Sequence, residues 1–131
     1  MLLLPHILIV DDNPDHRLIL TYYLGKIGSF DIREVEDGQQ ALAVLATVAP
    51  DLIFMNLGLP LLDGWEAIRR IRALAAPLGQ VPIIAFTAYD GRQEEQHARH
   101  VGCDAYLVKP VQDRDRLQQL VTSLLARGPR P

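Results

Sequence analysis

The stretch DLIFMNLGLPLLDGWE, residues 51 to 66, decides the fold. Residues 52 to 55 form a short apolar run that ends at the polar Asn56, which is typical of a strand buried on both faces. After a turn, Asp63 is followed three residues later by Glu66, a spacing that favours the start of a helix. A buried strand that leads through a turn into a helix is the repeating unit of a parallel α/β sheet.

The same alternation extends along the chain in both directions. Apolar runs at 6–11, 81–87 and 104–109 predict three more buried strands, and the more polar run at 30–35 predicts an edge strand. Asn13 followed by Pro14 favours a helix start. Apolar residues at helical spacing predict further helices around three sets: Leu20, Tyr23, Leu24 and Ile27; Leu42, Leu45, Ala46 and Ala49; and Leu117, Leu120, Val121 and Leu124.

Two weaker helices complete the pattern. Ile68, Ile71 and Ala75 continue the helix that starts at Asp63, and the polar segment 92–101 predicts a helix that is only lightly docked. Five strands alternating with five helices indicate an α/β fold, an open parallel sheet with helices on both faces. The carboxyl ends of its strands lie along one edge, where ligands bind in such sheets.

Length and composition limit the function classes. A chain of 131 residues makes one domain, which we place at 6–126 with an extension at 1–5 and a frayed tail at 127–131. With 49% hydrophobic residues, 22% charged residues and a net charge of −3, the sequence favours neither disorder nor general nucleic-acid binding. The single Cys103 forms no internal disulfide, so we expect a buried core thiol and a cytoplasmic protein, without membrane association.

Polar residues stand at the predicted strand ends: Asp11, Asp12, Asn56, Thr87 and Lys109. Adjacent carboxylates suit a hard cation such as Mg²⁺, a lysine neutralises a phosphoryl oxygen, and a threonine hydroxyl donates to another. Each residue alone has an ordinary explanation as a loop cap, a solvated lysine or a hydrogen bond at a strand end. Their combination at one sheet edge indicates a phosphoryl and cation site.

Four segments carry a resemblance to a known family: ILIVDDN (7–13), DLIFMNLGLPLLDGWE (51–66), PIIAFTA (82–88) and GCDAYLVKP (102–110). Together they resemble the receiver domain of two-component response regulators, from about residue 6 to residue 125. The resemblance implies a flavodoxin-like (βα)5 fold with strand order 2-1-3-4-5. It also implies a Mg²⁺ site formed by Asp11, Asp12, the side chain of Asn56 and the carbonyl of Gly58.

The resemblance further implies a signalling switch rather than an enzyme. In the family a phosphoryl group draws in the threonine, here Thr87, and the aromatic on the last strand, here Tyr106, swings inward. The peptide bond between Lys109 and Pro110 is expected to be cis. The implied partner is a histidine kinase or histidine phosphotransfer protein that docks on the first helix and the acidic edge, in a stand-alone receiver that works in a phosphorelay. Homodimers would form through the 92–101 helix, the last strand and the last helix, or through the first and last helices.

Asn56 departs from the family pattern. In receivers this position is an Asp whose carboxylate attacks phosphorus, and an amide cannot form that acyl phosphate. Losing one formal charge also weakens cation binding by on the order of a few kcal/mol for charges about 4 Å apart at an effective dielectric near 20. Without phosphate we expect mainly the inactive arrangement. The chain is either a natural receiver that works without phosphorylation or a receiver changed to lock it off, and the intact pocket favours the second explanation.

Other interpretations are weaker. A flavodoxin-like mononucleotide-binding module needs a phosphate-cradling turn after the first strand, where DDNPD supplies negative charge instead. A phosphatase with Asp11 or Asp12 as nucleophile lacks a cap domain and a second base. His97 and His100 are spaced to share a metal, but a solvated helix face explains them better. Trp65 is expected to serve packing.

Overall fold

The computed structural model describes residues 3–59, 62–88 and 91–130, so residues 1–2 of the predicted extension and 131 of the tail lie outside it. Within these ranges, five strands and five α-helices alternate as predicted. The strands are β1 (His6–Val10), β2 (Asp31–Val35), β3 (Leu52–Met55), β4 (Ile83–Thr87) and β5 (Ala105–Val108). The helices are α1 (Pro14–Ile27), α2 (Gly38–Leu45), α3 (Gly64–Arg72), α4 (Arg92–Val101) and α5 (Arg114–Arg127), with a short 3-10 helix η1 (Leu78–Gln80) before β4.

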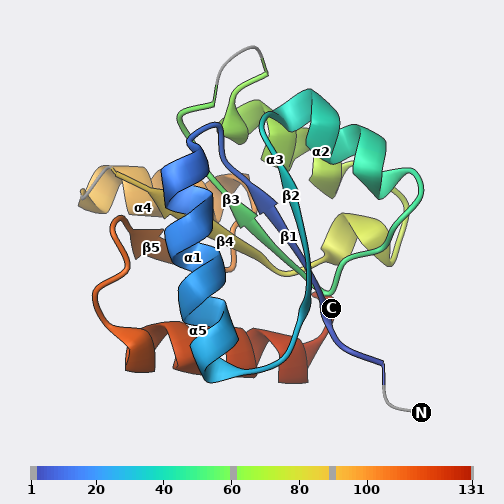
Figure 1. The fold of residues 1–131 in the computed structure, drawn as a ribbon. Coiled ribbons are helices and arrows are strands. Elements are labelled where there is room, and N and C mark those ends of the chain that lie inside the picture. The colour runs from blue at the N-terminus through green and yellow to red at the C-terminus, as the bar shows by residue number, and fades with distance from the viewer. Residues whose placement is uncertain (1–2, 60–61, 89–90, 131) are drawn as a thin grey trace.

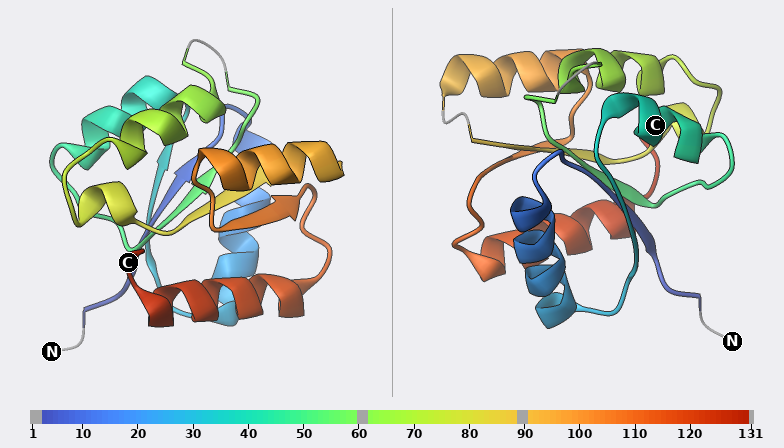
Figure 2. Two further views of the ribbon diagram at one scale, coloured as in Figure 1. Left: turned by 180° about the vertical axis from the view of Figure 1, so that it is seen from behind. Right: turned by 45° about the horizontal axis from the view of Figure 1, so that its top comes forward.

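All neighbouring strands pair in parallel, in the order β2-β1-β3-β4-β5. This is the flavodoxin-like order that the sequence resemblance implied, and it is confirmed. Helices α1 and α5 cover one face of the sheet, while α2, α3 and α4 cover the other (Figures 1 and 2). The strand order reverses at β1 and β3, so the crevice between their carboxyl ends is the expected place for a functional site.

The sheet is packed on both faces. The side chains of β3 are fully buried, as are Leu20 and Leu24 of α1 and Ile68 and Ile71 of α3. Burial of each such side chain stabilises the fold by about 1.5–3 kcal/mol. The strand ends that carry the polar residues therefore follow strands that are buried in the core.

The helix starts agree with the sequence, but two helix ends do not. The side chain of Asn13 accepts hydrogen bonds from the amides of Asp15 and His16, and Asp63 caps α3 through the amide of Glu66 at 2.8 Å. We expected apolar periodicity to carry α2 to Ala49 and α3 to Ala75, whereas these helices end at residues 45 and 72. Prolines at 50 and 77 disfavour helical conformation just before them, which shortens both helices. The Lys109–Pro110 bond is cis, as predicted, and so is Ala76–Pro77.

The described part of the C-terminal tail is held down, which corrects the expectation that it frays. The carboxylate of Asp104 is 2% exposed and pairs with Arg72 at 3.0 Å, Arg127 at 3.0 Å and Arg130 at 3.3 Å. The backbone amide of Arg130 also donates to the carbonyl of Gln80 at 2.8 Å. A carboxylate this deeply buried needs cationic partners, and the tail supplies two of them.

Candidate functional site

The sheet brings together the polar residues that follow its strands. The backbone amide of Asn56 donates to the carbonyl of Val10 at 2.9 Å, and the backbone amide of Lys109 donates to the carbonyl of Thr87 at 2.7 Å. These bonds extend the β1–β3 and β4–β5 ladders past the strand ends. The side chains of Asp11, Asp12, Asn56 and Lys109 consequently form one connected cluster.

Asn56 lies at the centre of this cluster and is 8% exposed. Its amide nitrogen donates to Asp11 Oδ1 at 3.3 Å and to Asp12 Oδ1 at 3.2 Å. Its carbonyl oxygen accepts from the backbone amide of Gly58 at 3.3 Å. The opposite orientation would face an oxygen without a hydrogen toward two carboxylates and would lose all three bonds. The nitrogen therefore points into the acidic pair.

Asp11 is the buried anion of the site, 1% exposed. One carboxylate oxygen accepts from Asn56 and from the Asn13 amide at 3.0 Å, while the other accepts from Lys109 Nζ at 2.5 Å. The Lys109 ammonium also lies 5.2 Å from the centre of the Phe86 ring, within range of a cation–π contact. The carboxylate of Asp11 thus accepts hydrogen bonds from Asn13, Asn56 and Lys109. Asp12, in contrast, is exposed.

Two residues of α1 join the site that sequence reasoning did not select. His16 Nδ1 lies 3.0 Å from Lys109 Nζ and 3.8 Å from Asp11 Oδ2. Arg17 donates to the backbone carbonyl of Asp11 at 2.6 Å and pairs with Glu34 at 3.2 Å. Side chains in the first turn of a helix tilt toward its amino end. Applied to a helix that starts at Pro14, this rule could have identified His16 and Arg17 as residues near the strand ends.

The two predicted switch residues lie inside the fold. Thr87 is 1% exposed at the end of β4, and Tyr106 is 5% exposed in the core formed with α2, α3 and α4. The burial of Tyr106 is what a packed strand aromatic requires, and a switch residue must also pack. The mainly inactive arrangement stays a prediction. Small neighbours such as Ala85 and Ala98 in the same cluster leave room for the ring.

The donor set fits a divalent cation only in part. Carboxylates such as those of Asp11 and Asp12 are suitable ligands. However, Oδ1 of each acid already accepts a hydrogen bond from Asn56, and Oδ2 of Asp11 accepts one from Lys109. The carbonyl oxygen of Asn56 faces Gly58 instead of the acids. Among the described residues, no group of three or more His, Cys, Asp or Glu side chains is arranged to hold a metal, and this includes His97 and His100.

Trp65 and Cys103 have the packing roles that the sequence predicts. Trp65 is partly buried against the core of α2, α3 and α4, and its ring centre lies 4.5 Å from that of His97 on α4. Cys103 is 3% exposed, and burial raises the pKa of its thiol to about 12. A thiol this protected is a structural residue and not a nucleophile.

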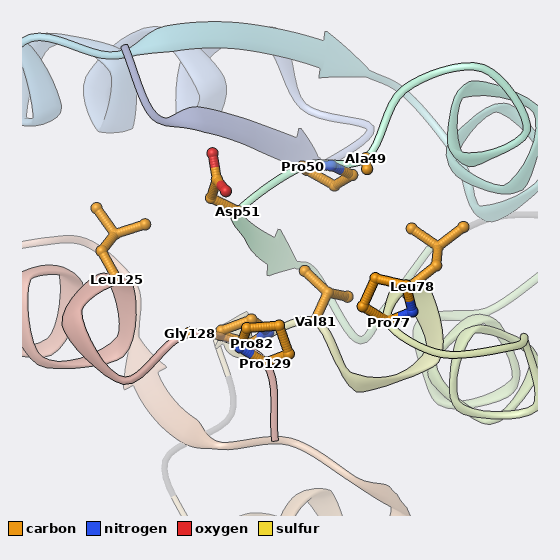
Figure 3. Close-up of a pocket in the computed structure, with 10 residues that line it drawn as sticks. All are labelled: Ala49, Pro50, Asp51, Pro77, Leu78, Val81, Pro82, Leu125, Gly128 and Pro129. Carbon is orange, nitrogen blue, oxygen red and sulfur yellow. The ribbon is translucent and has the colours of Figure 1, made fainter. Parts of the chain in front are cut away.

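A separate apolar pocket of about 150 Å³ lies at the opposite edge of the sheet (Figure 3). Its walls come from the segment before β3, the region around η1 and the end of α5, and Asp51 is their only charged residue. Small-molecule sites usually enclose at least about 300 Å³ and contain convergent polar groups. This pocket is therefore distinct from the polar site and too small for such a ligand.

The chain is similar to known signalling proteins over nearly its whole length. The model of the response regulator receiver domain matches residues 7–122. An uncharacterized 14.6 kDa protein of Leptolyngbya boryana is 35% identical over 94% of this chain and 92% of its own length. The sensor protein GacS of Pseudomonas syringae pv. syringae is also 35% identical, but its match covers 97% of this chain and only 14% of that protein.

Solved structures agree with these sequence matches. The receiver domain of a sensor histidine kinase from Pseudomonas aeruginosa PAO1, with a magnesium ion coordinated in its active-site cleft, superposes with a TM-score of 0.83. It is 34% identical, and the match covers 95% of this chain and 99% of that one. A putative response regulator from Chloroflexus aurantiacus has a TM-score of 0.87 at 28% identity, with coverage of 95% and 100%.

Proposed function

Because this chain belongs to the response regulator receiver domain family, we propose that it is a two-component signalling module that accepts no phosphoryl group at residue 56. It acts as a binding partner rather than as an enzyme. The observation that carries the proposal is the chemistry of Asn56. The residue that follows β3 and contacts both acids is an amide, which has no anionic oxygen to attack phosphorus.

The rest of the phosphoryl pocket supports a role as a stable scaffold. Lys109 stays paired with Asp11, and Thr87 and Tyr106 are enclosed. Without an acyl phosphate at residue 56, we expect no covalent signal to remodel the surface made by α4, β5 and α5. A ligand changes such an equilibrium only through differential contacts, and the amide of Asn56 forms no acyl phosphate to supply them.

The surface of α1 supports docking of a helical partner. Leu18 and Tyr22 are 69% and 61% exposed and lie one turn apart, with Ile19 beside them. An apolar stripe on an exposed helix is suited to the face of another helix. The proposed partner is a histidine kinase or a histidine phosphotransfer protein, which would meet this stripe and the adjacent Asp12.

Further elements of the proposal rest on the composition and the fold. The single buried thiol favours the cytoplasm. None of the helices in the described parts of the chain has the length and apolar character needed to span a bilayer. Self-association would use the surface of α4, β5 and α5, or that of α1 and α5. The mononucleotide-binding alternative is not favoured, because the turn after β1 presents carboxylates where phosphate would bind.

Restoration of the carboxylate tests the proposal. Asn56→Asp is incubated beside the native chain with a small phosphodonor and Mg²⁺, and both are analysed by intact-protein mass spectrometry. We expect the gain of one phosphoryl group on the Asp variant and none on the native chain. Equal gains on both proteins would show that another side chain is modified, and no gain on either would show that the missing carboxylate is not what prevents phosphorylation.

A further inference from the structure

The divalent cation expected of this family meets a pocket whose centre is already occupied by a side chain. We infer that the amide nitrogen of Asn56 takes the place of the cation, so that the side chain competes with divalent metal ions instead of coordinating them. This inference rests on the proposed function and concerns the same site. It reverses the expectation that Asn56 contributes its carbonyl oxygen as a metal ligand.

The hydrogen bonds of the amide carry the inference. Its nitrogen is within 3.3 Å of one oxygen of each acid, so its two hydrogens are directed at two different carboxylates. A cation at the position of this nitrogen, between Asp11 and Asp12, would use the same two oxygens. The amide thereby bridges the acids as a metal would, but with partial charges instead of a formal charge.

A third hydrogen bond holds the amide in this orientation. The carbonyl oxygen accepts from the Gly58 amide at 3.3 Å, and turning it toward the acids would remove that partner as well as both carboxylate bonds. Asn56 is only 8% exposed, so water cannot readily replace the hydrogen bonds that are lost. Metal binding through Asn56 thus requires three hydrogen bonds to break before one coordination bond forms.

Lys109 also competes with a cation, because it pairs with the oxygen of Asp11 that Asn56 does not contact. Its ammonium pairs with the second oxygen of Asp11, and its side chain is 6% exposed. One oxygen of Asp11 accepts from Lys109 and the other accepts from Asn56 and Asn13, so both oxygens already have hydrogen-bond partners. Only Asp12, which is exposed, remains able to attract a cation from solvent.

The test uses Mn²⁺ as an oxygen-seeking probe, with the free ion measured by electron paramagnetic resonance. The native chain is compared with Asn56→Ala and Asn56→Asp. Removing the amide should tighten Mn²⁺ binding by about three- to tenfold, as expected for release of long charge-assisted hydrogen bonds. Restoring Asp should tighten it further, because a formal charge is added. Equal or weaker binding by Asn56→Ala than by the native chain would overturn the inference.

Two controls keep the result specific. Adding Asp12→Asn to the Ala variant should abolish the gain, since the gain depends on both acids, and persistence of the gain would place the ion elsewhere and overturn the inference. The side-chain NH₂ signals of Asn56 in ¹⁵N spectra give an independent readout. Their half-maximal change should need about three- to tenfold more Mg²⁺ than half-saturation of the Ala variant, and a half-maximal change at the same or a lower concentration would overturn the inference.

The outcomes separate this inference from the proposed function. If the native chain bound Mn²⁺ more tightly than Asn56→Ala and still took no phosphoryl group, the competition would be refuted while the proposed function stood. If the native chain became phosphorylated at residue 56, the proposed function itself would fail.

Discussion

Replacing Asp104 with Asn should destabilise the protein strongly, although the site at the other sheet edge stays intact. The carboxylate is 2% exposed and pairs with three arginines, and one oxygen also accepts from the Ile83 amide at 2.8 Å. Burial lowers the pKa of Arg72 and the nearby Asp104 opposes that shift, so the loss of this charge leaves a buried guanidinium without its anion.

The expected magnitude comes mainly from Arg72. Breaking a buried ion pair by removing one partner costs about 3–5 kcal/mol, and an Asn that keeps the Ile83 bond reduces this loss. Arg127 and Arg130 are more than a third exposed, so solvent screening limits each to about 0–1 kcal/mol. We expect a loss of about 3 kcal/mol in the free energy of unfolding. For 131 residues this corresponds to a Tm lower by about 10 °C.

Urea and thermal unfolding measure the change, with Asp115→Asn as the matched control. Asp115 is exposed in the first turn of α5, where a carboxylate contributes only about 0.3–1 kcal/mol. In native-state hydrogen exchange, the Arg130 amide, which donates to Gln80, should exchange faster in the Asp104 variant. Equal stability of the two variants, or an unchanged Arg130 amide, would refute the view that Asp104 holds the tail.

Three further predictions follow from single contacts. Gly64→Ala should destabilise the protein, because an added Cβ would lie 2.2 Å from the backbone oxygen of Asn56. Gly25→Ala lies on open helix surface and should instead raise the free energy of unfolding by about 0.5–1 kcal/mol, so similar urea midpoints for the two variants would contradict this prediction. The Cys103 thiol should react with thiol reagents only after unfolding, and rapid labelling of the folded protein at pH 8 would contradict this. Because the pKa of this thiol is about 12 in the folded protein and near 9 when unfolded, the free energy of unfolding should fall as pH rises from 9 to 12. His97→Ala should change the fluorescence of Trp65, the only tryptophan, while lowering stability by less than about 1 kcal/mol; an unchanged spectrum would show that the ring contact is absent in solution.

Much of the architecture could be predicted because its signals are local. Apolar runs such as 52–55 can be recognised within four residues, and the caps at Asn13 and Asp63 within three more. Parallel strands then place their carboxyl ends at one edge, which brings Asp11, Asn56 and Lys109 together without knowledge of any side-chain contact. Strand order was available only through the family resemblance.

The features that sequence reasoning missed depend on distant partners or on orientation. Asp104 pairs with residues far along the chain, and no local pattern distinguishes Arg127 and Arg130 from solvated tail residues. The orientation of the Asn56 amide depends on a choice between two acids and the Gly58 amide, which only the assembled site decides. Local pattern identifies which residues meet, and packing decides how they face one another.

A crystal structure of the Asn56 chain grown with Mg²⁺ and beryllofluoride would show whether the side chain of Asn56 excludes the cation. We expect that the Asn56 nitrogen still bridges Asp11 and Asp12, with no beryllofluoride beside residue 56. Density for beryllofluoride joined to that side chain, with Mg²⁺ between the two acids, would contradict it.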